Sequence, residues 1–123
     1  MEIRNKLSRI YRWEYFWLCV IVIVTLAMHF AIITHPDQLV LDEQHYVKDA
    51  RSIIASNHDE RPEHPPLAKL FITSGLYAFG DNPWGWRVPS IIMGTISIVL
   101  FFFICRKLGL SRRAVNIATF LLA

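Results

Sequence analysis

Residues 88–105 read VPSIIMGTISIVLFFFIC, a run of 18 residues without a formally charged side chain. A helix needs about 20 predominantly apolar residues to cross the hydrocarbon core of a bilayer, so this run predicts a transmembrane helix. Residues 16–34 hold a second such run, and residues 114–123 begin a third. The pattern predicts an all-α polytopic membrane protein. We expect this chain to be its N-terminal piece, because a helix that stopped half-way across lipid would leave backbone carbonyls without partners.

The composition agrees with this class of protein. Of the 123 residues, 54% are hydrophobic and only 19% are charged, and the apolar residues gather in long runs instead of recurring at the period of a helix or strand. Such clustering argues against an ordinary soluble domain. Both cysteines, Cys19 and Cys105, fall within predicted spans. We therefore expect neither a disulfide framework nor a nucleophilic thiol.

Basic side chains cluster beside the two predicted spans. Four lie in residues 1–15 and four in residues 106–113, whereas the segment 35–66 has seven acidic side chains against three basic ones. An excess of Lys and Arg marks the cytoplasmic side of a membrane protein. We predict a cytoplasmic basic N-terminus (1–15), an extracytoplasmic loop (35–87) and a cytoplasmic turn (106–113), in a multi-pass protein of the cell membrane.

Two other interpretations of the basic clusters are weaker. Nucleic-acid binding is not expected, because the clusters flank spans and are not gathered on one face. A cleaved signal peptide fits poorly, because the first apolar run is longer than a usual signal core and no cleavage site of small residues follows it.

The predicted outer loop contains two short amphipathic or interfacial helices, at about 41–56 and 66–79. The first has apolar residues on one broad face at helical spacing. Pro65 and Pro66 suit the first turn of the second helix, and Gly80 suits its end. This second helix is too short for a confident span. We expect it to lie along the outer membrane surface or to re-enter part way.

Two polar clusters and one arginine of this loop could carry chemistry. Asp42 and Glu43 follow a membrane exit closely, although capping of the next helix alone would explain an acid there. His64 and Lys69 belong to a second cluster; an exposed histidine and a snorkelling lysine are their ordinary explanations. Arg87 either snorkels to headgroups or pairs with a lipid phosphate or with the acidic pair.

A metal site is the less favoured interpretation of the remaining polar residues. Asp42, His45 and Asp49 share one helical face, and His58 and His64 could join them. Spacing on one short helix does not establish the convergent geometry that a metal needs. We interpret these as solvated surface residues and expect no cofactor, with a divalent metal left open.

Three motifs occur in a recognisable order: LDEQHY at 41–46, HPPLAK at 64–69, and GWRVPS at 85–90 with Gly94 behind it. From about residue 41 to residue 110 the chain resembles the start of a protein O-mannosyltransferase. More broadly, it resembles the polyprenyl-phosphate-sugar-dependent glycosyltransferases of the GT-C fold. The resemblance implies a large multi-span enzyme. Such an enzyme takes a sugar, here mannose, from a polyprenyl phosphate on the outer face and passes it to a hydroxyl acceptor, here protein Ser or Thr.

The resemblance also implies roles for single residues. Asp42 matches the acidic residue taken as catalytic base, and Glu43 matches its neighbour, which helps to place the acceptor or the base. His64 matches the histidine of the His-Pro-Pro motif. Arg87 matches an arginine that supports the donor phosphate or the loop structure.

General chemistry fits these roles. An alcohol is a poor nucleophile at neutral pH, so a carboxylate that takes its proton would accelerate transfer. We hypothesise Asp42 as the base and Glu43 as its partner, with Arg87 and Lys69 as phosphate-side cations. One base and a single displacement predict inversion at the anomeric carbon. The expected partners are the polyprenyl-phosphate sugar, a protein or glycan hydroxyl group, and membrane lipids.

Two alternatives stay open on the sequence. One is a related transferase, similar to aminoarabinose transferases, that glycosylates a lipid or glycan. The other is a non-catalytic membrane subunit that binds lipid-linked sugar. Whether the enzyme is a mannosyltransferase or a related transferase, this piece alone is expected to be inactive, because most of a donor cavity would be missing.

Overall fold

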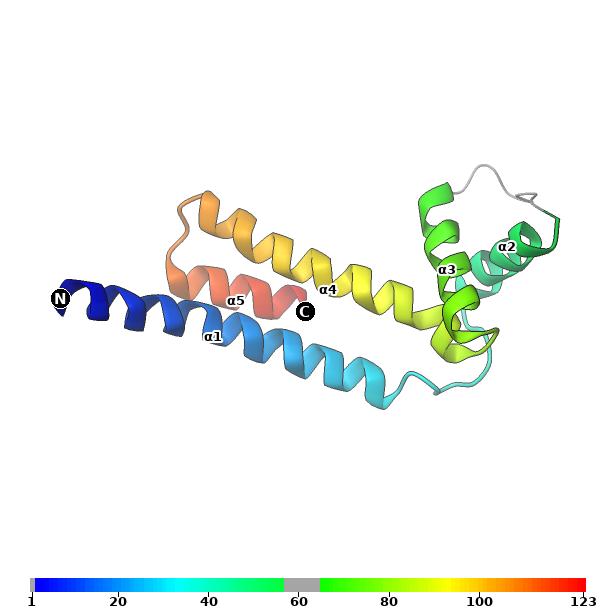
Figure 1. Cartoon of the computed structure of the whole chain (residues 1–123), viewed down its shortest axis with the longest axis horizontal. Coiled ribbons are helices and arrows are strands. Elements are labelled where there is room, and N and C mark those ends of the chain that lie inside the picture. The colour runs from blue at the N-terminus through cyan, green and yellow to red at the C-terminus, as the bar shows by residue number, and fades with distance from the viewer. Residues whose placement is uncertain (1, 57–64) are drawn as a thin grey trace. The chain divides into compact units, whose positions relative to one another are not determined.

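The computed structural model describes the backbone of residues 2–56 and 65–123, and the side chains of residues 15–56 and 65–123 (Figure 1). Every regular element in these ranges is an α-helix, which confirms the all-α prediction for this part of the chain. In chain order the helices are α1 (Glu2–Ala31), α2 (Glu43–Ser56), α3 (Pro66–Phe79), α4 (Pro83–Lys107) and α5 (Arg112–Leu122).

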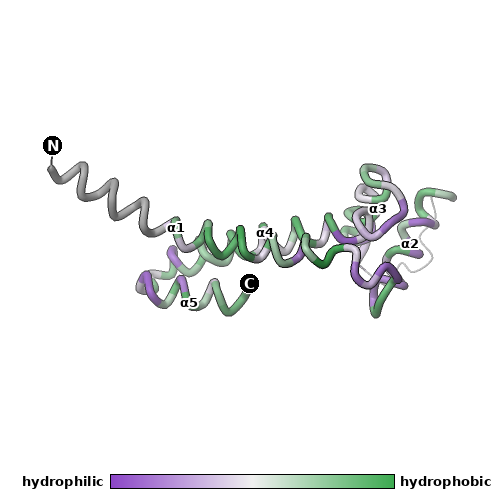
Figure 2. Tube along the Cα trace, turned by 90° about the horizontal axis from the view of Figure 1, so that it is seen from below, coloured by the Kyte–Doolittle hydropathy of each residue, from purple (hydrophilic) through white to green (hydrophobic). Residues whose placement is uncertain are grey.

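Among the described residues, α4 is the one helix long and apolar enough to cross a membrane, by length and composition. Only 22% of its most apolar stretch is buried, whereas the central helix of a soluble protein is mostly buried. The segment Tyr15–Ala31 of α1 is a shorter apolar stretch. Both regions are mainly green in the hydropathy view (Figure 2). These helices indicate a membrane protein.

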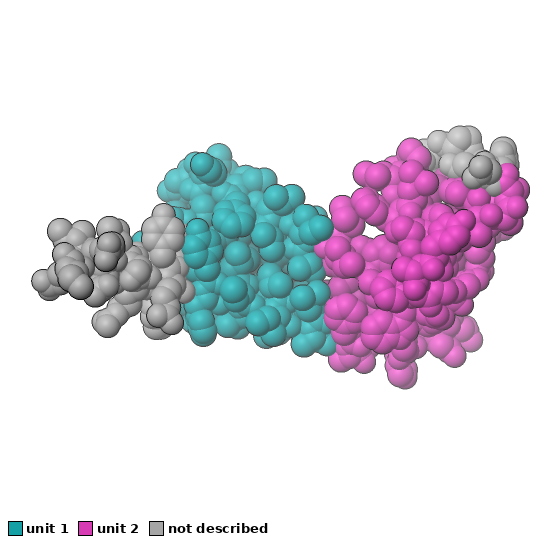
Figure 3. All heavy atoms as spheres, viewed as in Figure 1, with its two compact units in different colours: residues 1–28, 94–123 teal, residues 29–93 magenta. Residues whose placement is uncertain are grey.

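The chain divides into two compact units, residues 1–28 with 94–123 and residues 29–93 (Figure 3). The first unit has a small apolar core, formed by the buried side chains of Leu18, Phe102, Cys105 and Val115. Helix α5 starts with a capping hydrogen bond, since the Ser111 side chain accepts from the Ala114 N–H at 3.3 Å. The helix therefore begins at Arg112, slightly before the start at 114 that the sequence predicted.

The second unit is built on the packing of α2 against α3. Its core consists of Val47, Ala50, Ile72, Leu76 and Trp86. Thus α2 buries one apolar face, as its helical pattern predicts, although it begins at Glu43 and not at 41. Helix α3 has the bounds that its proline start and glycine end predict.

Helices α3 and α4 cross with backbone against backbone. A Cβ atom added to Gly75 would overlap the carbonyl oxygen of Gly85 and the ring of Pro89. A Cβ atom added to Gly85 would overlap the carbonyl oxygen of Gly80. Only glycine fits at both positions, so this crossing fixes the start of α4 against α3.

The segment between α1 and α2 is irregular. Helix α1 ends at Ala31, before the predicted end of the span at residue 34. A cis peptide bond joins His35 to Pro36. Leu41, the residue before the acidic pair, has φ +48°, a left-handed conformation that non-glycine residues seldom adopt. This segment leads the chain directly to Asp42 and Glu43.

Candidate active site

Arg87 of α4 and Glu43 of α2 form a bidentate ion pair, although 44 residues separate them in the sequence. Arg87 Nε lies 2.8 Å from Glu43 Oε1, and Arg87 Nη2 lies 3.0 Å from Glu43 Oε2. The side chains are 13% and 27% exposed. Two parallel charge-assisted hydrogen bonds are the strongest arrangement open to these groups. The pair joins the first residue of α2 to the first turns of α4.

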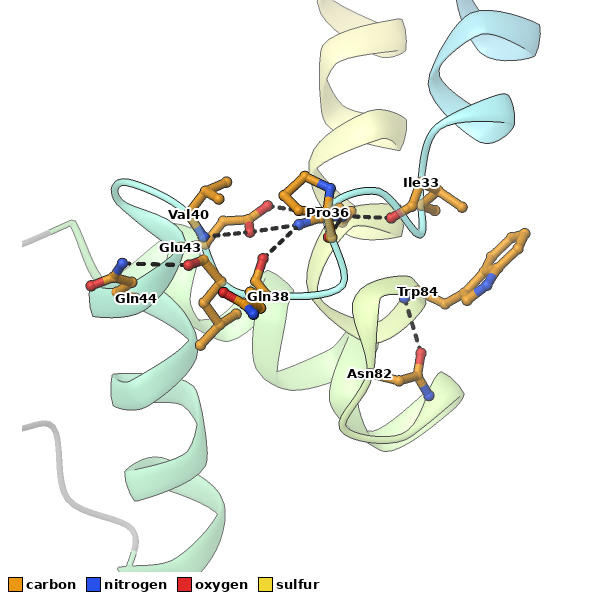
Figure 4. A network of polar contacts seen from close by, with 10 residues as sticks. Ile33, Pro36, Gln38, Val40, Glu43, Gln44, Asn82 and Trp84 are labelled. Carbon is orange, nitrogen blue, oxygen red and sulfur yellow. Dashed lines mark hydrogen bonds and ion pairs between the residues drawn. The ribbon is translucent and has the colours of Figure 1, made fainter.

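The same guanidinium also holds the loop that precedes α2. Its Nη1 donates to the carbonyl oxygens of Ile33 (2.6 Å) and Pro36 (2.8 Å), and its Nη2 donates to that of Gln38 (3.2 Å). Figure 4 shows these loop residues and Glu43 joined by contacts that converge on one place. A guanidinium has five N–H donors, and these five hydrogen bonds occupy all of them. We call this arrangement the Arg87 clamp.

The Arg87 clamp bears on the role expected for Arg87. A phosphate could bind the guanidinium only by displacing Glu43 or the loop carbonyls. Of the roles considered for Arg87, pairing with the acidic residues and support of the loop are therefore the ones that the geometry favours. The phosphate contact stays an untested prediction.

Glu43 is held as an anion. Its Oε2 accepts a further hydrogen bond from the Val40 N–H at 3.2 Å. The hydrogen bonds from Arg87, aided by that from Val40, lower the pKa of Glu43 below its ordinary value, against the opposing effect of burial. A carboxylate whose lone pairs are engaged and whose pKa is lowered is a weak proton acceptor. This geometry favours an anchoring role for Glu43 over proton transfer.

Asp42 is in the opposite situation. Its side chain is exposed and accepts no hydrogen bond from the described residues. Its backbone carbonyl accepts from the Tyr46 N–H at 3.1 Å, which places Asp42 at the N-cap position of α2. The acidic pair thus combines one engaged carboxylate with one available carboxylate.

Lys69 is buried and does not reach solvent. Its side chain is 0% exposed, and its Nζ lies 3.2 Å from Oδ2 of Asp49, whose side chain is 1% exposed. The interpretation of Asp49 as a solvated surface residue is therefore wrong. Asp49 lies one turn from Tyr46 and one turn from Ile53 on α2, so an acid inside an apolar face was the signal for a buried pair. Lys69 stays a predicted substrate-binding residue, but here it belongs to the interior.

A third ion pair joins α2 to the turn before α4. Arg51 Nε lies 2.8 Å from Asp81 Oδ2, and Trp86 Nε1 donates to Asp81 Oδ1 at 2.7 Å. The hydrogen bonds from Arg51 lower the pKa of Asp81. Arg51 and Asp81 are 44% and 50% exposed. The sequence does not reveal this pair, because two exposed residues so far apart leave no pattern.

The structure does not describe every predicted site residue. His64, expected to contact substrate, and His58, considered as a metal ligand, lie outside the described residues. Among the described residues, no group of three or more His, Cys, Asp or Glu side chains is placed to hold a metal ion.

Comparison with known proteins shows which family the chain is similar to. Residues 63–123 match a family described as dolichyl-phosphate-mannose-protein mannosyltransferase. A polyprenol-phosphate-mannose–protein mannosyltransferase of Corynebacterium glutamicum is 30% identical over 92% of this chain and 24% of its own length. A protein of the same name from Mycobacterium tuberculosis is 30% identical over 80% of this chain and 20% of its own length. The chain thus spans at most about a quarter of these relatives. No solved structure matches it.

Proposed function

This chain is a protein O-mannosyltransferase-like family member, and we propose that it provides the proton acceptor of an enzyme that moves mannose from a polyprenyl phosphate to a protein hydroxyl group. The donor and the acceptor are the ones that the names of its relatives state. A family resemblance does not identify the residues that act. The support for their roles comes from the geometry around Asp42.

The observation that carries the proposal is the contrast between the two adjacent carboxylates. Asp42 is exposed and available, at the start of a helix that Glu43 and the Arg87 clamp hold in place. A carboxylate held so can take the proton of a Ser or Thr hydroxyl as the oxygen attacks, which accelerates transfer by about 10²–10⁴-fold. We propose Asp42 as the catalytic base and Glu43 as the residue that fixes its position.

The donor phosphate needs positive charge or hydrogen-bond donors as the bond to mannose breaks. Two of the three predicted substrate-binding residues, Arg87 and Lys69, are engaged in ion pairs within the chain. The third, His64, directly precedes the prolines that open α3. We propose that His64 binds the donor, while Arg87 acts by holding the loop.

The setting that we propose is the outer face of a multi-span enzyme of the GT-C fold. The distribution of Lys and Arg supports a loop of residues 35–87 outside the membrane. One base and one displacement lead to inversion at the anomeric carbon, because the acceptor attacks from the face opposite the departing phosphate.

The deciding experiment uses the complete protein in membranes with labelled polyprenyl-phosphate mannose and a Ser- or Thr-rich acceptor polypeptide. We expect inverted mannose on the polypeptide with the wild-type protein and almost none with Asp42→Asn at equal expression. Near-normal transfer by that variant would remove Asp42 from the role. Label in a lipid or glycan would point to a related transferase, and no label at all would point to a non-catalytic subunit.

A further inference from the structure

The Asp49–Lys69 pair is the most deeply buried charged feature of the described chain. Both side chains are essentially inaccessible, at 1% and 0% exposure, beside the apolar core of Val47, Ala50, Ile72, Leu76 and Trp86. The pair links the middle of α2 to the first turn of α3. Neither the proposed base chemistry nor the Arg87 clamp uses it.

Stability does not explain such a pair well. Removal of two charges from water is costly, and a buried ion pair repays that cost only when hydrogen bonds satisfy its remaining lone pairs. Here neither carboxylate oxygen of Asp49 accepts a hydrogen bond, although Lys69 Nζ lies within ion-pair distance of one of them. Apolar residues of similar size would stabilise the contact at least as well.

A buried ion pair does define one arrangement of the two helices. Apolar surfaces can slide over one another with little penalty, whereas a shift that separates two buried charges is strongly unfavourable. Asp49 lies two turns along α2 from Asp42, and α2 is a continuous helix between them. The contact at Asp49 therefore fixes how α2 is rotated about its own axis and how far it is shifted along α3. Both determine the position of the end of α2 that carries Asp42.

We propose that the Asp49–Lys69 pair is a positioning element, which sets the place of the Asp42 carboxylate by fixing α2 on α3. This inference rests on the proposed function for its catalytic consequence. Two contacts then define the catalytic end of α2: the Arg87 clamp acts on its first residue, and the buried pair acts two turns further along. Lys69 serves Asp42 through Asp49 and does not contact the donor.

The test compares the double variant Asp49→Leu with Lys69→Met against wild type in the complete protein. Met is unbranched like Lys, and Leu branches at Cγ like Asp, so the double variant removes both charges of the pair together. We expect an unchanged unfolding temperature, a kcat lower by roughly 10–100-fold because the base is misplaced, and an unchanged donor KM. Arg51→Met is the matched control, since it removes a cation from an exposed pair of the same helix. It should leave kcat and KM unchanged.

Hydrogen exchange of the α2 amides gives a measurement that does not depend on catalysis. We expect the first turn of α2 to exchange faster in the double variant than in wild type or in Arg51→Met. A double variant with wild-type kcat and wild-type exchange overturns the inference. So does a raised donor KM with normal kcat, which would place Lys69 at the donor, and so does a double variant that fails to fold, which would make the pair a stability element. If the wild-type protein itself transfers no mannose, the proposed function fails, and the exchange rates alone decide the positioning role.

Discussion

Asp42 and Glu43 are neighbours in the sequence, but Arg87 holds Glu43 in a bidentate ion pair while the Asp42 carboxylate is exposed and accepts no hydrogen bond from the described residues. We propose that the two carboxylates divide two roles between them: Glu43 holds the helix, and Asp42 accepts the proton.

Loss of the two carboxyl groups should have different effects. Asp42→Asn removes the proposed base, so we expect kcat to fall by about 10²–10⁴-fold without a change in unfolding temperature. Glu43→Gln removes the anion that faces Arg87, so we expect a lower unfolding temperature as well as lower activity. Asp37→Asn, an exposed acid of the same loop, is the control. Thermal unfolding with parallel transfer assays measures both effects, and identical behaviour of the two variants would argue against the division.

Arg87→Lys should not be a conservative change. An ammonium group has three donors and cannot replace five hydrogen bonds in a planar arrangement. We expect unfolding to become easier by about 2 kcal/mol or more, since at least two charge-assisted hydrogen bonds are lost. The loop before α2 should also become more sensitive to protease. Arg51→Lys, in an exposed pair, should cost about 0–1 kcal/mol. Equal losses for the two variants would contradict the special status of Arg87.

Acid should weaken the Arg87 clamp. The folded-state pKa of Glu43 lies below its ordinary value of 4.5. At pH values between the lowered pKa and 4.5, the unfolded chain therefore binds more protons than the folded one. The free energy of unfolding should therefore fall as the pH drops from 4.5 through the lowered pKa, while the contribution of Glu43 is fully present above 4.5. Glu43→Gln should flatten this part of the pH profile. Asp81→Asn should flatten it less, because Asp81 is half exposed. A Glu43→Gln profile parallel to that of wild type would refute this assignment.

Gly75→Ala should separate α3 from α4. The new methyl group would overlap the backbone of Gly85 and the ring of Pro89, and neither can move as a flexible side chain could. We expect a loss of about 1–3 kcal/mol, as in other overpacked interiors. Gly94→Ala provides the contrast, because nothing lies within 4 Å of its added Cβ and alanine favours a helix. Chemical unfolding of both variants tests this, and a stable Gly75→Ala protein would mean that the crossing is looser than described.

The sequence predicts some of these features for clear physical reasons. Pro66 and Gly80 mark the ends of α3, because proline suits a first helical turn and glycine suits the left-handed residue behind a helix. The acidic pair stands out because it follows a long apolar run. Local chemistry is sufficient for features of this kind.

Other features depend on the packing of distant segments. Lys69 looks like an interfacial lysine until α2 brings Asp49 beside it, and the two residues are 20 positions apart. The close approach at Gly75 depends on the angle at which α3 meets α4, which no local pattern encodes. The Arg87 clamp depends on the positions of three backbone carbonyls. Every residue type has a backbone carbonyl, so the sequence gives no sign of these contacts.

That last property has an evolutionary consequence. Arg87 binds the loop by donating hydrogen bonds to the main-chain carbonyls of Ile33, Pro36 and Gln38. The identities of the side chains there therefore matter little to these hydrogen bonds. The spacing of the carbonyls matters a great deal. Homologues should therefore differ freely in residue type across this stretch while they preserve its length, and a one-residue deletion there should do more harm than several simultaneous substitutions.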